Sequence, residues 1–146
     1  MPLNPPIGPN GEIIAHDDSA IRRGSMLIQH INSAEHVIFD ENINVRRITK
    51  AAFSPTSGDP DYGMSVDIGQ LLDEAGLRED AVVPGGMGAV KLEVGPVRDL
   101  GLRVGSDPIP SNKYHGQVWD VKDKKRKKLH ELVVDWVVPI PGVRIR

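Results

Sequence analysis

The chain contains no cysteine, and it is poor in aromatic residues. Without cysteine it can form neither a disulfide nor a zinc or iron–sulfur site with thiolate ligands. Such a sequence is typical of a reducing compartment, so we expect a cytoplasmic protein. Only two Phe, two Tyr and two Trp occur in 146 residues. Proteins that bind single strands without sequence preference stack bases on such rings, so this class of function is disfavoured.

Long hydrophobic runs and a strong net charge are also missing. The longest apolar stretch, residues 132–138, is interrupted by Asp135 and falls far short of the roughly 20 residues that a membrane helix needs. The first residues show neither the basic region nor the apolar core of a secretory signal. We therefore expect no membrane contact. A net charge of −2 gives the chain as a whole no attraction for nucleic acid.

Prolines and glycines are concentrated in the first 18 residues of the chain. They leave little regular structure available there, because proline fixes φ and lacks an N–H donor. We predict a flexible arm over residues 1–18. Residues 19–146 show no internal repeat and no linker, and their number suits one domain. We predict a single globular domain over that range.

The β-favouring runs are short and are separated by turn residues. Residues 36–39 and 44–49 flank an Asp-Glu-Asn turn and predict a hairpin. Residues 26–31 fit a strand or a helix, and further strands are expected at 63–68, 89–94, 102–104 and 114–121.

Apolar residues near the C-terminus recur at helical spacing: Leu129, Leu132, Val133, Trp136 and Val137. This stripe predicts an amphipathic helix from Asp123 to Val137, which Pro139 would end. Together the elements predict an α+β fold, with a mostly antiparallel sheet, a few short helices and a C-terminal amphipathic helix.

Six of the seven residues from 122 to 128 are basic: Lys122, Lys124, Lys125, Arg126, Lys127 and Lys128. On the expected helix they lie at the N-terminus, where the helix dipole disfavours each cation by about 0.3–1 kcal/mol. The run is therefore either a solvated turn or a place where an anion binds. We predict that it binds nucleic acid or an acidic protein, through contacts that read little sequence.

A second set of candidate residues lies on predicted strands. Arg46 and Arg47 must face opposite sides of one strand, and an inward arginine needs an anion or a carboxylate partner. Ser65 and Asp67 share a face of the next strand, where Asp67 is expected to cap a helix. His115 begins a later strand and can act as a general acid or base. Each residue also has a purely structural interpretation, as a salt bridge, a cap or a loop anchor.

No motif points to a metal or a cofactor. The five histidines lack the spacing of a zinc site, and the H-E-x-x-H pattern is missing. The glycine-rich residues 84–88 lack the Lys-Ser/Thr ending of a phosphate-binding loop and predict a turn. We expect neither a metal nor a cofactor.

Short motifs follow one another along residues 44–139: Arg46-Arg47-Ile48, Ala51-Ala52-Phe53, Met64-Ser65-Val66-Asp67, Gly88-Ala89-Val90, Leu100-Gly101-Leu102, Asp107-Pro108-Ile109-Pro110-Ser111-Asn112, His115 and Asp135-Trp136-Val137. Their order resembles that found in an uncharacterised group of small bacterial proteins. The resemblance implies a bacterial origin and brings no established activity, so it supplies no catalytic residue. It points to Arg46, Arg47, Ser65, Asp67 and His115 as one cluster.

These observations leave three kinds of function open. The first is a binding module that acts through residues 122–128, and the second is an interaction protein without chemistry. The third is an enzyme whose catalytic residues are Arg46, Arg47, Ser65 and His115 and whose substrate is of nucleotide type. An arginine strand followed by a serine strand is similar to ADP-ribosyltransferase-like domains, although Glu93 is a poor match for their catalytic glutamate. A phosphodiesterase or RNase-like site centred on His115 is the other enzymatic alternative.

Overall fold

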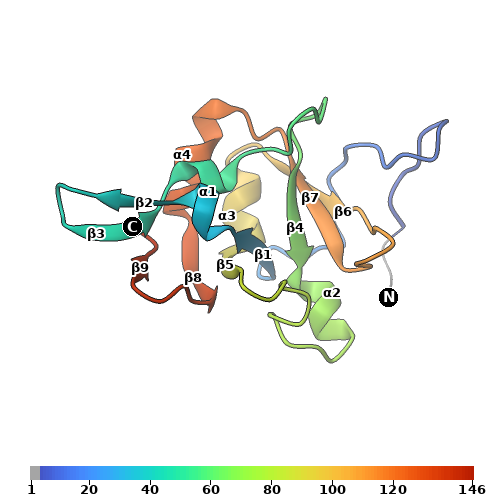
Figure 1. Cartoon of the computed structure of the whole chain (residues 1–146). Coiled ribbons are helices and arrows are strands. Elements are labelled where there is room, and N and C mark those ends of the chain that lie inside the picture. The colour runs from blue at the N-terminus through green and yellow to red at the C-terminus, as the bar shows by residue number, and fades with distance from the viewer. Residues whose placement is uncertain (1–3) are drawn as a thin grey trace.

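The computed structural model describes residues 4–146, which form two β-sheets and several short helices (Figure 1). The main sheet has six strands in the order β6-β7-β4-β1-β5-β8. All its registered pairs are antiparallel. Its strands are β1 (Met26–Ile31), β4 (Met64–Ile68), β5 (Gly88–Glu93), β6 (Arg103–Ser106), β7 (His115–Trp119) and β8 (Val133–Val138).

The second sheet is small and contains the expected hairpin. Strands β2 (Val37–Asp40) and β3 (Val45–Ile48) pair antiparallel, and β9 (Val143–Arg144) pairs parallel to β3. Asn44 takes a positive φ of 54° in the connecting turn, a conformation that Asn tolerates better than most residues. The hairpin projects from the body on the side away from the N-terminal segment (Figure 1).

The helices are short, which confirms the expected α+β class with its mostly antiparallel sheet. Within residues 4–146 no helix has the length and apolar character needed to cross a bilayer. The helices are α1 (Ser33–His36), the 3₁₀ helix η1 (Lys50–Phe53), α2 (Gly69–Glu74), α3 (Val94–Asp99) and α4 (Asp123–Glu131).

The predicted helix from Asp123 to Val137 is wrong over its second half. Helix α4 ends at Glu131, and β8 pairs with β5 at the edge of the main sheet. Four of the six residues of β8 are valines, and β-branched side chains favour extended backbone. Helical and strand periods both place Leu129 and Val133 inside, so the apolar pattern alone did not separate the two structures.

Side chains of the main sheet alternate between an apolar and a polar face. The apolar face holds the core and is covered by η1, α3 and α4; its strand residues include Leu27, Ile31, Val66, Ile68, Val90, Leu92, Val104 and Val118. The opposite face carries His30, Ser65, Asp67, His115 and Gln117, which alternate in sequence with the core positions. These polar side chains thus lie on one side of the sheet, whereas Gln29 is in phase with Leu27 and Ile31 and bonds Ala52 of η1 on the other.

Part of the predicted arm packs against the edge strand β6. The backbone N–H of Asp18 donates to the Val104 carbonyl at 2.8 Å, and a carboxylate oxygen of Asp17 accepts from the Val104 N–H at 2.9 Å. The His16 ring lies 5.0 Å from the Trp119 ring, centroid to centroid. Residues 1–3 of the arm lie outside the described residues, and its flexibility stays a prediction.

Phe53 is the largest fully buried side chain, and its ring stacks on His130 of α4 with centroids 5.5 Å apart. We predict that Phe53→Ala lowers the free energy of unfolding by about 3–5 kcal/mol, because it leaves a cavity between η1 and α4. Phe39→Ala is the matched control, since Phe39 is 55% exposed and should change stability by less than about 0.5 kcal/mol. Urea denaturation measures both, and equal effects would contradict the assignment of the core.

Candidate functional site

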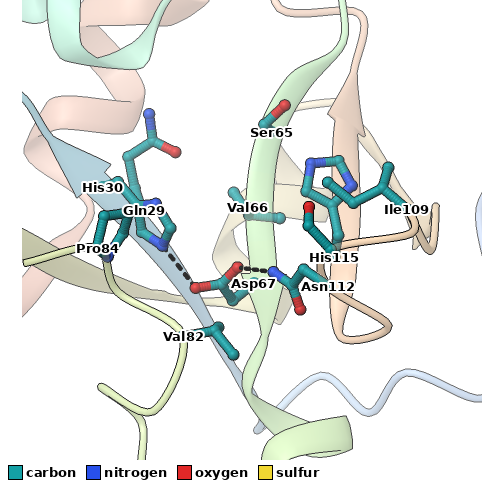
Figure 2. Close-up of a pocket in the computed structure, with 11 residues that line it drawn as sticks. Gln29, His30, Ser65, Val66, Asp67, Val82, Pro84, Ile109, Asn112 and His115 are labelled. Carbon is teal, nitrogen blue, oxygen red and sulfur yellow. Dashed lines mark hydrogen bonds and ion pairs between the residues drawn. The ribbon is translucent and has the colours of Figure 1, made fainter.

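A cavity of about 570 Å³ opens on the polar face of the main sheet. Strands β1, β4 and β7 form its floor, and two loops form its rim (Figure 2). Its lining mixes apolar walls with convergent polar groups, a combination typical of small-molecule sites. The lining residues are Gln29, His30, Ser65, Val66, Asp67, Val82, Pro84, Ile109, Ser111, Asn112 and His115.

The cavity lies where β1 and β4 separate. The two strands register at Leu27 with Ile68 and at Ile28 with Asp67, and the ladder stops there although both strands continue. The next positions in that register would pair Gln29 with Val66 and His30 with Ser65. Because these positions are unpaired, a slot remains between the strands, and Gln29 and Ser65 line it. For brevity we call this gap the β1–β4 slot.

Asp67 is the most deeply buried charged group of the site, with 1% of its surface exposed. One carboxylate oxygen lies 2.6 Å from His30 Nε2, and the other accepts from Asn112 Nδ2 at 2.9 Å (Figure 2). The predicted role of Asp67 as a helix cap is wrong, because Ile68 occupies the N-cap of α2 without a side-chain hydrogen bond. The carboxylate instead connects β1, β4 and the loop before β7.

His30 Nε2 carries a hydrogen toward Asp67, since a carboxylate that also accepts from Asn112 acts as an acceptor. Its Nδ1 makes no hydrogen bond within residues 4–146. In the neutral ring that nitrogen therefore keeps its lone pair. A buried carboxylate on one ring nitrogen orients the imidazole and stabilises the charge that it carries after taking a proton.

His115 has the opposite tautomer. Its Nδ1 lies 2.7 Å from the carbonyl oxygen of Asp107, and a carbonyl can only accept, so Nδ1 carries the hydrogen. The Asp107 carboxylate is farther away, at 3.7 Å. Nε2 of His115 makes no hydrogen bond within the described residues and keeps its lone pair in the neutral ring. The expected loop-anchoring hydrogen bond thus exists and leaves the second nitrogen free.

A second, smaller cavity of about 340 Å³ lies beside the first and shares Gln29 and Ser65 with it. His36 and Glu35 of α1 contribute to its wall. Nδ1 of His36 accepts from the Asn32 backbone N–H at 2.9 Å, and burial lowers the pKa of the His36 ring below its usual value. His36 is therefore present as a neutral ring near pH 7.

The structure does not bring the two predicted arginines into the cavity. Arg47 Nε donates to the Asp40 carboxylate at 2.8 Å within the hairpin, and this hydrogen bond lowers the pKa of Asp40. Arg46 is exposed on the same hairpin. The structural interpretation, a salt bridge on a small sheet, therefore accounts for Arg47. Of the predicted cluster, Ser65, Asp67 and His115 converge on one cavity.

The predicted basic surface lies on and just before α4. Four of its six cations are exposed: Lys122, Lys124, Lys127 and Lys128. Lys125 Nζ donates to the Leu100 carbonyl at 2.6 Å, and Arg126 pairs with Asp123 at 3.0 Å. These two side chains therefore support the fold, and the exposed lysines are the ones available to a partner.

Sequence reasoning missed His30, Gln29 and Asn112 as members of the site. His30 lies on a segment whose strand or helix character the pattern left open, and its partner Asp67 is 37 positions away. Strand register, which no local pattern reveals, brings the two together. Asn112 ends the proline-containing segment that precedes His115. Its closeness in sequence to this candidate residue was the one signal that could have identified it as a member of the site.

Within residues 4–146 no group of three or more His, Asp and Glu side chains is arranged to hold a metal ion. Compared with known proteins, the chain matches no family model, no curated protein and no solved structure. The resemblance to the bacterial group stays a prediction. The geometry of the cavity is therefore the feature that indicates a function.

Replacing Asp67 by Asn tests the role of its carboxylate. The amide offers one acceptor where two donors point, so either His30 or Asn112 faces an N–H₂ group. We predict that Asp67→Asn lowers the free energy of unfolding by about 1–3 kcal/mol in urea denaturation. The exposed Asp73 has no side-chain hydrogen bond within the described residues, so Asp73→Asn should have an effect below about 0.5 kcal/mol. A neutral Asp67→Asn variant would mean that the carboxylate does not hold the site together.

Proposed function

We propose that the cavity is the active site of an enzyme that uses acid–base catalysis for hydrolysis or group transfer. The observation that carries this proposal is a pair of histidines that line one cavity. Each ring is held by a hydrogen bond through a different nitrogen. His30 is held through Nε2 and His115 through Nδ1. Each neutral ring therefore presents one unprotonated nitrogen. The one on His115 can take a proton, and the one on His30 can give a proton once that ring is protonated, and a paired acid and base are what such reactions require.

His115 is the general base in this proposal. Its Nε2 accepts the proton of a water or of a substrate hydroxyl, and the oxygen then forms the new bond to the electrophilic centre. The Asp107 carbonyl fixes the ring tautomer that makes Nε2 available. Ser65, on the exposed polar side of β4, lines the same cavity and can orient a substrate group through its hydroxyl.

His30 is the general acid, supported by Asp67. The protonated ring keeps its Nε2–H on the Asp67 carboxylate and gives its Nδ1 proton to the leaving group as the old bond breaks. The carboxylate stabilises the ring's positive charge before that transfer. At the end His115 holds one proton more and His30 one fewer, and exchange with water restores both. Asn112 holds Asp67 in place from the other side.

The positions of the arginines support this proposal over ADP-ribosyl transfer. In ADP-ribosyltransferase-like domains a strand arginine holds the dinucleotide, and here Arg46 and Arg47 lie on the hairpin outside the cavity lining. The two-histidine arrangement instead agrees with the alternative of a site centred on His115. Acid and base roles on two imidazoles need no strand arginine.

His115→Gln is the direct test, because the Gln side chain can still donate to the Asp107 carbonyl but cannot take a proton. We predict that turnover falls by about 10²–10⁴-fold. Chromogenic p-nitrophenyl acetate, p-nitrophenyl glycosides and bis-p-nitrophenyl phosphate cover ester, glycoside and phosphodiester cleavage. Lys124→Gln, an exposed substitution far from the lining, is the control and should keep the wild-type rate. An unchanged rate in His115→Gln, or no cleavage of any class by the wild type, would refute the proposal.

The exposed lysines of α4 favour a second candidate function, the binding of nucleic acid or of an acidic protein. Lys124, Lys127 and Lys128 occupy successive turns of one short helix. Such lysines contact phosphates as point charges and bring little sequence preference. The lack of cysteine fits the cytoplasm, where both partners are present. This surface and the cavity can act independently.

Salt dependence distinguishes such binding from a merely solvated helix. We predict that the triple change of Lys124, Lys127 and Lys128 to Gln reduces the slope of log K against log salt concentration by roughly 2–3 for duplex DNA or RNA. Fluorescence anisotropy measures the slope. Lys113→Gln, which alters an exposed lysine in the loop before β7, should leave the slope unchanged. Equal binding by the triple variant and the wild type would mean that these lysines are only solvated and do not bind nucleic acid.

A further inference from the structure

We infer that the cavity takes a neutral or cationic small molecule rich in hydrogen-bond donors, one of which binds Gln29 Oε1 in the β1–β4 slot. This inference deepens the proposed function and rests on it only in taking the cavity as the substrate site. Three observations carry it: an unpartnered buried acceptor, the slot that reaches it and the charge of the lining.

Gln29 is 7% exposed, and its amide is half satisfied. Nε2 donates to the Ala52 carbonyl at 2.7 Å, whereas Oε1 is buried and has no hydrogen-bond partner within the described residues. The Ala52 carbonyl fixes this orientation, because the reversed amide would place two oxygens against each other. Figure 2 shows the amide oxygen turned toward β4. Buried acceptors are nearly always satisfied in native proteins, so a donor from outside the chain completes this one.

The oxygen exposes less than 1 Å² of surface, so a ligand donor reaches it only by entering and widening the β1–β4 slot. Gln29 and Ser65 line both the larger cavity and the smaller one beside it. A ligand in the larger cavity can therefore extend past Ser65 into the smaller one, toward Glu35 and His36. Gln29 lies at the junction, where it contacts the middle of such a molecule. The acceptor is thus placed to select ligands by a donor group at that point.

The two linings also contain serine and threonine hydroxyls, which can donate or accept, the His36 Nε2–H, which donates, and several further acceptors. His115 Nε2 keeps a lone pair, and the carboxylates of Asp67 and Glu35 are negative. Within residues 4–146 neither lining includes a lysine or an arginine. The one cation that the proposed mechanism places in the lining, the protonated His30 ring, is already paired with the Asp67 carboxylate, so a phosphate or carboxylate would lose hydration without gaining an unpaired cationic partner. Hydroxyl and ammonium groups meet suitable partners, so sugars and amino sugars represent the ligand class better than nucleotides do.

Three probes that share one sugar ring and differ in charge test this ligand class: glucose, glucosamine and glucose 6-phosphate. Each is titrated into the ¹⁵N-labelled full chain while the side-chain amide signals are followed by NMR. We expect glucose and glucosamine to shift the Gln29 amide signals, and glucose 6-phosphate to bind at least tenfold more weakly. We expect Gln29→Met to weaken the binding of glucosamine about five- to tenfold, the effect of one lost hydrogen bond. Gln70→Met alters a glutamine of similar burial outside both linings and should leave that affinity unchanged.

Two results would overturn the inference. One is equal or tighter binding of glucose 6-phosphate at the cavity, and the other is no shift of the Gln29 signals with either sugar at tens of millimolar. Both come from the wild-type chain, so they do not depend on whether Gln29→Met folds. If the phosphate binds and His115→Gln still abolishes turnover, the ligand class is wrong and the acid–base assignment stands. If the sugars bind and His115→Gln keeps its rate, the reverse holds.

Discussion

The buried carboxylate of Asp67 is the group on which the geometry of the cavity depends. A carboxylate with 1% exposure is unfavourable unless donors replace its lost water. His30 on β1 and Asn112 in the loop before β7 supply them, and so three segments far apart in sequence are tied to one point. The same contact crosses the place where β1 and β4 stop pairing. It therefore orients His30 and spans the edge of the slot that reaches Gln29.

Because side chains alternate along each strand, the residues that stabilise the fold and most residues of the candidate site lie on opposite faces of the main sheet. One face packs its valines, leucines and isoleucines against η1, α3 and α4 and supplies the burial that stabilises the fold. The other face carries the two histidines, the aspartate and the serine. Substitutions at partly exposed positions of that polar face can therefore change chemistry with modest effects on stability, whereas the buried Asp67 affects both and Phe53 with its neighbours affects mainly stability. The exposed lysines of α4 lie neither in the core nor in the cavity lining, so they form a separate surface.

Sequence patterns predicted those turns and strands whose formation depends mainly on neighbouring residues. The hairpin followed from its turn and strands β4, β5, β6 and β7 from β-favouring runs, whereas the pattern left β1 open between strand and helix. Ser65 and Asp67 followed from a common strand face, and His115 was grouped with them through the resemblance to the bacterial group. Two features could not be predicted from the sequence: strand β8 and the contacts that depend on strand register. The second half of the expected C-terminal helix is strand β8, because tertiary pairing with β5 decided between two patterns that share Leu129 and Val133. Register placed His30 beside Asp67 and kept Arg47 on the hairpin with Asp40.

The proposed acid–base pair depends most directly on the opposite tautomers of His30 and His115. Long-range ¹H–¹⁵N NMR of the histidine rings at alkaline pH reports directly which nitrogen of each ring carries the hydrogen. The geometry predicts Nε2–H for His30, held by Asp67, and Nδ1–H for His115, held by the Asp107 carbonyl. The same tautomer in both rings, or exchange between tautomers in either, would contradict the paired acid and base.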